Sequence, residues 1–431
     1  MGEGVLTAPF ARVDGAFLCE GVPAESIAAG VGTPAFVYST GMIRSQYRRL
    51  TAVLNDVPHR VHYAMKANGS LGVLGVIRAL GAGVDCVSGG ELFRARMAGF
   101  ASRDIVLGGV GKREDEIRDA LEFGVDCITA ESEAEVRLIA DVARSLDVVA
   151  PVALRVNPEV TVDAFHDYVK TGQSGDKFGI PIDQAFDVAT LTASLDDVRL
   201  VGLHQHVGSQ LFNLDGFIDG AERLLALHAR LRAKAPRAVA AMQTFDIGGG
   251  LGATYNGEPE PDLAALGRMV RRAHEATRLI VLLEPGRFLV ANAGVMLTRV
   301  LYRKRSGATE FIITDAGMND LLRPALYDAW HRIEAAQATD GRIVAEIVGP
   351  VCESGDFLAR AREVDDVHAG DLLIVQSAGA YGFAMASNYN ARPRAAEVLV
   401  DAGKWGVVRD RERYEDLVRG ERVNPEWSEV P

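Results

Sequence analysis

The chain has 431 residues, of which 48% are hydrophobic and 24% charged, a composition typical of a globular protein with two or three domains. Its net charge of −12 argues against nucleic acid or an anionic membrane as a partner, and no apolar run is long enough to span a bilayer. The 4 cysteines lack the spacing of a zinc site, so we expect no metal and reduced thiols in a cytoplasmic protein.

Residues 1–34 consist of short apolar pieces without a clear helix, and a short strand at 36–38 precedes a helix capped by Thr40. Strand-like runs then follow at 61–67, 83–88, 105–109, 126–130, 152–157, 201–207, 244–248 and 280–285. Helical patterns separate most of them, at 89–98, 112–123, 132–145, 183–194, 216–235 and 261–277. This alternation favours a (β/α)8 barrel, because the rival doubly wound sheet would carry a G-x-G-x-x-G after its first strand.

Past residue 290 the apolar pattern changes to a period of two residues. Clear examples lie at 295–300, 310–314, 371–375 and 397–400. Alternation of this kind is typical of antiparallel strands with one buried face. We therefore predict two domains: a barrel over 35–290, and a mostly antiparallel β domain built from 1–34 and 291–431.

The first predicted barrel strand ends in Lys66, directly before the polar stretch Asn68-Gly69-Ser70. Burying an ammonium group is costly unless the group is paired or neutralised. One use for such a lysine is a Schiff base with an aldehyde cofactor. Taken alone, a lysine at a strand end is more often an ordinary exposed residue. Whether Lys66 belongs to a cofactor site therefore depends on the residues at the other strand ends.

Barrel enzymes build their active sites at the carboxyl ends of the strands. In this chain those ends carry Lys66, Asp85, Ser88, Arg155, Asn157, His204, His206, Ser209, Gly248, Gly249, Gly250, Glu284 and Arg287. Three successive glycines allow backbone N–H groups to approach a phosphate, and an arginine adds a charge-assisted bond. A carboxylate can hold a pyridine nitrogen protonated. Each residue alone has a structural interpretation, such as a tight turn or an ion pair, but their convergence on one rim favours a cofactor site.

Several motifs resemble the pyridoxal-phosphate-dependent decarboxylases of the alanine-racemase-like fold. They are 63–68 (YAMKAN), 206–210 (HVGSQ), 246–250 (DIGGG) and 284–287 (EPGR). Within that family, 315–327, 349–356 and 378–382 resemble the diaminopimelate decarboxylases more closely than their relatives. The resemblance covers about residues 34–420, while the loop at 166–172 differs in detail from the family pattern.

The resemblance implies that pyridoxal 5'-phosphate is the cofactor and that Lys66 binds it as a Schiff base. His206 would stack on the pyridine face, and Glu284 would pair with the pyridine nitrogen. The groups expected to hold the phosphate are Ser209, Gly248, Gly249, Gly250, Arg287 and Tyr381. Asp85 and Gly286 complete the expected cofactor-binding set.

The resemblance also implies how the substrate is bound and where a second subunit contributes. The expected substrate-binding residues are Arg287, Arg323, Tyr327, Glu353 and Tyr381. The expected catalytic residues are Lys66, His206, Glu284 and Cys352, with Cys352 as the proton donor. Cys352 and Glu353 would come from the partner in a homodimer, so that the active sites would lie at the subunit interface.

The spacing of Arg323 and Tyr327 indicates the substrate class. Four residues apart, they would share one face of a helix and suit a carboxylate, whereas Glu353 suits an ammonium group. This combination favours decarboxylation of meso-2,6-diaminopimelate to L-lysine, the last step of lysine biosynthesis. Alternatives are a decarboxylase of carboxynorspermidine or of a carrier-bound amino acid, an amino-acid racemase, and an inactive partner-binding homologue. Glu284 argues against the racemase, because racemases of this fold usually place an arginine opposite the pyridine nitrogen.

Overall fold

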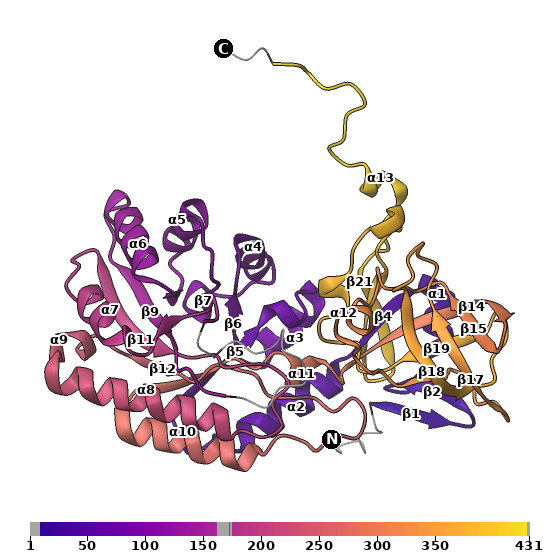
Figure 1. The fold of residues 1–431 in the computed structure, drawn as a ribbon, viewed down its shortest axis with the longest axis horizontal. Coiled ribbons are helices and arrows are strands. Elements are labelled where there is room, and N and C mark those ends of the chain that lie inside the picture. The colour runs from indigo at the N-terminus through magenta and orange to yellow at the C-terminus, as the bar shows by residue number, and fades with distance from the viewer. Residues whose placement is uncertain (1–8, 162–171, 173–174, 429–431) are drawn as a thin grey trace.

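The structure is a computed structural model that describes residues 9–161, 172 and 175–428, and its first unit is a closed barrel of parallel strands (Figure 1). Each strand pairs with the next along the chain, and the last pairs with the first. The barrel strands are β5 (His59–Ala64), β6 (Gly83–Cys86), β7 (Ile105–Leu107), β8 (Cys127–Ala130), β9 (Ala150–Asn157), β11 (Val198–His204), β12 (Thr244–Asp246) and β13 (Ile280–Leu283). The predicted (β/α)8 barrel is thus confirmed, and every observed strand overlaps its expected range.

Helices cover the outside of the barrel, with α8 and α10 lying side by side (Figure 1). They are α2 (Thr40–Ala52), α3 (Leu71–Ala79), α4 (Gly89–Met97), α5 (Glu114–Phe123), α6 (Glu133–Ser145), α7 (Ala185–Thr192), α8 (Asp215–Lys234), α9 (Pro236–Val239) and α10 (Leu263–Thr277). The short helix α11 (Arg287–Val290) is buried instead. Ser39, not the predicted Thr40, caps α2, because its hydroxyl accepts from the Met42 amide while Thr40 donates to Asp401.

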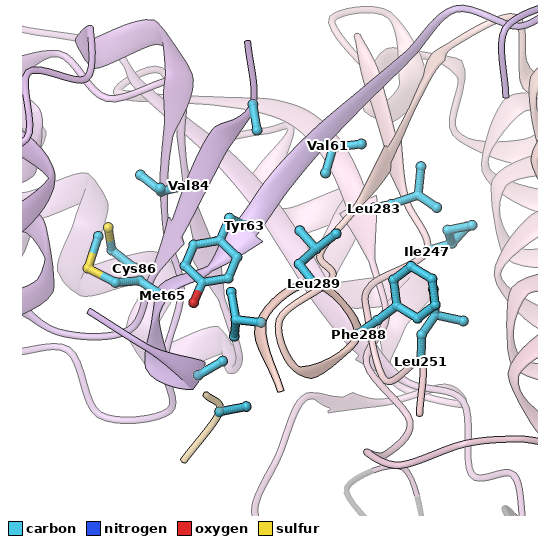
Figure 2. Packing of buried hydrophobic residues seen from close by; sticks show 14 of the residues in the cluster. Val61, Tyr63, Met65, Val84, Cys86, Ile247, Leu251, Leu283, Phe288 and Leu289 are labelled. Atoms are coloured by element: carbon cyan, nitrogen blue, oxygen red, sulfur yellow. The ribbon is translucent and has the colours of Figure 1, made fainter. Parts of the chain in front are cut away.

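Apolar side chains of the barrel strands pack against those of α11 (Figure 2). Figure 2 shows Val61 and Tyr63 of β5 close to Leu283 of β13, with Phe288 and Leu289 of α11 beside them. Full burial of each such side chain stabilises the fold by roughly 1.5–3 kcal/mol. Because α11 is anchored in this core, its first residue is held rigidly at the barrel mouth.

The second unit is a mostly antiparallel sheet with the order β18-β17-β15-β14-β4-β20-β21. Strand β19 also pairs with β14, and β16 pairs with β19. Its strands are β4 (Ala35–Ser39), β14 (Gly294–Ser306), β15 (Thr309–Thr314), β16 (Ile333–Ala335), β17 (Arg342–Val348), β18 (Phe357–Asp365), β19 (Leu372–Val375), β20 (Ala396–Asp401) and β21 (Lys404–Arg409). Strand β4 falls inside the range 35–290 expected for the barrel, yet it pairs with β14 and β20 and is buried on both faces. Sheet pairing therefore divides the chain after Ser39 and not at residue 35.

The N-terminal segment contains a helix that the sequence pattern did not predict. Three short strands, β1 (Phe10–Val13), β2 (Ala16–Cys19) and β3 (Val22–Pro23), precede α1 (Ala24–Val31). The helix buries Ile27 and Ala28 against the second sheet, in a cluster that includes Val37 and Val398. Two further short helices are α12 (Arg323–Tyr327) and α13 (Tyr414–Leu417). Among the described residues, no helix has the length and apolar character needed to cross a membrane.

Candidate active site

Five of the predicted rim residues, Lys66, Arg155, His206, Ser209 and Arg287, line one cavity of about 390 Å³ at the carboxyl ends of the barrel strands. Its polar and aromatic lining comprises Lys66, Arg155, Phe178, His206, Ser209, Arg287, Tyr327 and Tyr381. A second recess shares Lys66 and His206 with the cavity and adds Asp85, His204 and Glu284. The structure therefore brings together residues from strands that are far apart in the sequence.

Lys66 lies just past its strand and not on it, which corrects the sequence-based expectation. Strand β5 ends at Ala64, and Lys66 is the middle residue of a single 3-10 turn, η1 (Met65–Ala67). The Asn68 amide donates to the Met65 carbonyl at 3.0 Å and closes this turn. The Tyr381 amide donates to the Ala67 carbonyl at 2.8 Å, which ties the turn to the second unit.

Acidic groups surround the Lys66 amine. Burial acts to lower the pKa of Lys66, but the charges of Asp85, Tyr381 and Glu284 raise it above its usual value. Burial raises the pKa of Asp85 to about 8, with Glu284 adding to the shift and Lys66 opposing it. The lysine thus lies beside one carboxyl group that holds its proton near neutral pH.

Glu284 follows β13 and stays ionised although it is buried. Burial acts to raise the pKa of Glu284, but His204, His206 and Lys66 together hold it well below its usual range. The closest of these contacts joins His204 Nε2 to Glu284 Oε2 at 3.0 Å. The rim therefore presents a carboxylate that can stabilise a positive charge.

Asp246 lies beside Glu284 in the opposite protonation state. Burial and the charge of Glu284 raise the pKa of Asp246 well above its usual range. Its carboxyl oxygen accepts from the Gly248 amide at 2.8 Å and so caps the turn that follows β12. Ligating atoms of His204, Asp246 and Glu284 lie within 4.8 Å of one another, and hydrogen bonds among these side chains account for that closeness.

The three glycines after β12 are required by close backbone contacts. A Cβ atom at Gly248 would lie 2.1 Å from the Gln205 carbonyl oxygen, and one at Gly249 would lie 2.0 Å from that of Glu284. The Gly249 amide donates to His206 Nδ1 at 3.3 Å. Of the three amides, which we expected to bind an anion together, only that of Gly250 has no acceptor among the described residues. Gly286 also lies close to neighbouring atoms, since a Cβ there would approach that of Ala67 to 3.1 Å.

His206 keeps a neutral ring. Burial, followed by the positive charges of Lys66 and Arg155, lowers the pKa of His206 well below its usual value. Arg155 in turn donates to Glu131 at 2.9 Å, and its guanidinium lies 4.9 Å from the Phe178 ring centroid. A neutral aromatic ring at the cavity wall suits stacking on a planar ligand.

Arg287, the first residue of α11, is buried among hydroxyl groups. Its guanidinium donates to Ser209 Oγ at 3.1 Å and to the Tyr255 hydroxyl at 3.0 Å. The Tyr381 ring centroid lies 4.6 Å from the guanidinium carbon. Tyr381 has φ +55°, so its backbone is left-handed and its side chain is aimed by a strained turn. None of these partners carries a full negative charge.

Arg323 forms a second buried cation behind Tyr255. Its guanidinium carbon lies 4.4 Å from the Tyr255 ring centroid, and one N–H group meets His331 Nε2 at 2.9 Å. Tyr327, on the same short helix, lines the cavity, whereas Arg323 is not part of the cavity lining. Sequence reasoning did not identify Tyr255 and His331, because they lie outside the barrel strand ends and carry no motif of their own.

Cys352 and Glu353 do not join the cavity of their own chain. They lie in the exposed connection between β17 and β18, and neither lines the cavity or the recess. The Cys352 amide donates to Asn390 Oδ1 at 2.7 Å. Of the loop 166–172, whose sequence departs from the family pattern, only Gly172 belongs to the described residues.

The barrel, the antiparallel domain and the rim lysine together define a protein of the alanine-racemase-like fold. Residues 40–291 match the family model for the pyridoxal binding domain of pyridoxal-dependent decarboxylases. The chain belongs to this decarboxylase family.

The relatives of the chain match over nearly its whole length. The diaminopimelate decarboxylase of Pseudomonas aeruginosa is 46% identical over 418 residues, which cover 97% of this chain and 99% of the relative. That of Neisseria meningitidis serogroup B is 43% identical over 404 residues, 94% of this chain and 96% of the relative. The structure of the Helicobacter pylori enzyme complexed with L-lysine has a TM-score of 0.87 at 34% identity, covering 92% of this chain and 98% of the other. The structure of the M. jannaschii enzyme in complex with L-lysine has a TM-score of 0.90 at 33% identity, covering 96% of this chain and 98% of the other.

Proposed function

We propose that the chain binds pyridoxal 5'-phosphate and decarboxylates meso-2,6-diaminopimelate to L-lysine and CO2. The observation that carries this proposal is the pair of buried cations, Arg287 and Arg323. In the part of the chain that the structure describes, neither guanidinium pairs with a carboxylate. A buried charge without a counter-ion is costly, so the site favours ligands with two anionic groups in place. A cofactor phosphate and a substrate carboxylate would meet that need, and the names of the relatives support this substrate.

The residues around the cavity fit the cofactor. Lys66 offers a primary amine, Ser209 and Arg287 offer donors for a phosphate, and the Gly250 amide adds an unpaired N–H group. His206 offers a neutral ring against the pyridine face. When bound, the cofactor supplies an electron sink for the electron pair left on the substrate α-carbon after CO2 departs.

Side chains of the protein would hold the cofactor and transfer protons. Glu284 would hold a proton on the ring nitrogen, because it is ionised while neighbouring Asp246 is not. Lys66 would hold the cofactor through its amine, the group that a substrate amine would replace. Cys352 donates the proton that replaces the lost carboxylate.

Two elements would recognise the far end of the substrate. Arg323 and Tyr327 meet the carboxylate that is not lost, and Glu353 meets the ammonium group beside it. Cys352 and Glu353 would reach this site from the partner subunit of a homodimer. Their exposure in the single chain and their absence from its cavity support such a shared site.

Product analysis tests the substrate. The purified protein, supplied with pyridoxal 5'-phosphate, is incubated in parallel with meso-diaminopimelate, ornithine and carboxynorspermidine. We expect L-lysine and CO2 from the first and at most traces of product from the others. Faster release of CO2 from either alternative would assign the site to that substrate instead.

A further inference from the structure

The guanidinium of Arg323 is enclosed by two neutral side chains. One N–H group donates to His331 Nε2 at 2.9 Å, and the Tyr255 ring lies against the guanidinium at 4.4 Å. Arg323 is 3% exposed, and its Nε atom is buried with no hydrogen-bond partner among the described residues. The Tyr255 and His331 rings themselves meet edge to face at 5.4 Å. This arrangement fixes where the charge points while leaving part of it unsatisfied.

The tautomer of His331 is fixed by the backbone. Its Nδ1 atom lies 2.8 Å from the Gln376 carbonyl oxygen, which can only accept, so Nδ1 carries the proton. Nε2 therefore presents its lone pair to Arg323. Burial, followed by the positive charge of Arg323, lowers the pKa of His331 to about 3. The ring is a neutral acceptor at every pH near neutrality.

We propose that His331 is a positioning residue that sets the specificity for the distal substrate carboxylate by orienting Arg323 without neutralising it. The inference rests on the proposed function, because it takes the distal carboxylate as the ligand of Arg323. A carboxylate in place of the His331 ring would form an ion pair with Arg323 and compete with the substrate. A side chain without an acceptor would leave the guanidinium free to turn away.

Two matched variants separate the acceptor from the volume of the ring. In His331→Gln the side-chain oxygen can take the place of Nε2 and still accept from Arg323. In His331→Asn the shorter amide takes the place of Nδ1, keeps the bond to Gln376 and loses the bond to Arg323. We expect His331→Asn to raise KM for meso-diaminopimelate about tenfold and to change kcat less than about threefold. We expect His331→Gln to stay within about threefold of the wild type in both constants.

Competition by two related amines gives a readout that a merely structural role would not move. L-lysine keeps the distal carboxylate, whereas cadaverine has none. His331→Asn should weaken inhibition by L-lysine about tenfold and leave inhibition by cadaverine unchanged. The inference is overturned when both inhibitors weaken together, when both variants raise KM equally, or when His331→Asn leaves the KM at the wild-type value.

Nitrogen-15 NMR of histidine-labelled wild-type protein tests the same idea without any variant. We expect His331 to remain neutral with its proton on Nδ1 from pH 7.5 to pH 5.5. A protonated ring, or a proton on Nε2, would overturn the inference. Failure of the proposed function would show differently, as a wild-type protein that releases no L-lysine from meso-diaminopimelate.

Discussion

Glu284 and Asp246 lie at neighbouring strand ends, but their surroundings give them opposite protonation states. Both are buried near His204, but only Glu284 forms a hydrogen bond with it, and that contact keeps Glu284 ionised while Asp246 keeps its proton. The motif 284–287 predicted that Glu284 pairs with the pyridine nitrogen of the cofactor. The contact between Glu284 and His204 could not be predicted, because the two residues are 80 positions apart and meet only when the barrel forms.

Glu284→Gln should bind the cofactor but slow decarboxylation by about two orders of magnitude, or roughly 3 kcal/mol of transition-state stabilisation. The reason is that an amide cannot hold a proton on the ring nitrogen as a carboxylate does. Single-turnover rates measure the effect. Asp246→Asn is the matched control and should lose much less, since Asp246 is already neutral. Equal single-turnover rates in Glu284→Gln and the wild type would remove this role from Glu284.

His62 should make the fold sensitive to acid. Burial lowers its pKa to about 4, whereas an unfolded histidine titrates near about 6.5. Between these two pH values the unfolded chain binds a proton at His62 and the folded chain does not. The contribution of neutral His62 to stability is therefore fully present above about pH 6.5 and is lost as the pH falls toward about 4. The melting temperature of His62→Gln should fall less steeply over this window than that of the wild type. Parallel slopes would show that His62 does not contribute.

At the scale of elements, the loop after β12 illustrates why residue type and backbone geometry must agree. Gly248→Ala should lower the free energy of unfolding by more than about 2 kcal/mol, because φ is +75° and the new Cβ would collide with the Gln205 carbonyl. Gly257→Ala is the matched control: its φ is +79°, but no atom lies within 4 Å of the added Cβ. Chemical denaturation of both variants should therefore show the smaller loss for Gly257→Ala. Equal losses would mean that the loop relaxes around the added methyl group.

The barrel strands were predictable because each is a continuous apolar run between clear helices. Elements whose nature depends on distant partners were not. The apolar sequence of β4 resembles that of a barrel strand, but β4 pairs in the second sheet with β14 and β20, which lie more than 250 residues later. Helix α1 has a weak apolar stripe, and it is stabilised by packing against Val37 and Val398 of the second sheet. Lys66 was predicted at the end of a strand, but it lies in a 3-10 turn whose Ala67 carbonyl accepts from the Tyr381 amide of the other unit.

For the whole molecule, the site is proposed to be complete only in a dimer. Mixing an inactive Lys66→Ala chain with an inactive Cys352→Ala chain tests this, because a heterodimer would contain one site with both lesions and one with none. Activity should return to at most about half of the wild-type value per heterodimer. Co-expression with two different tags ensures that the subunits exchange. No recovery in purified heterodimers would place Cys352 in its own chain's site or outside catalysis.

The most direct measurement is the stoichiometry of L-lysine and CO2 formed from meso-diaminopimelate by the wild type and by Lys66→Ala. Lys66 lines both the cavity and the recess and lies in the family motif 63–68. We predict equal molar amounts of both products from the wild type, with the visible absorbance of a lysine-bound cofactor. Lys66→Ala should give neither product and lack that absorbance. Wild-type rates from Lys66→Ala, or a wild-type protein that binds the cofactor and releases no L-lysine, would contradict the account.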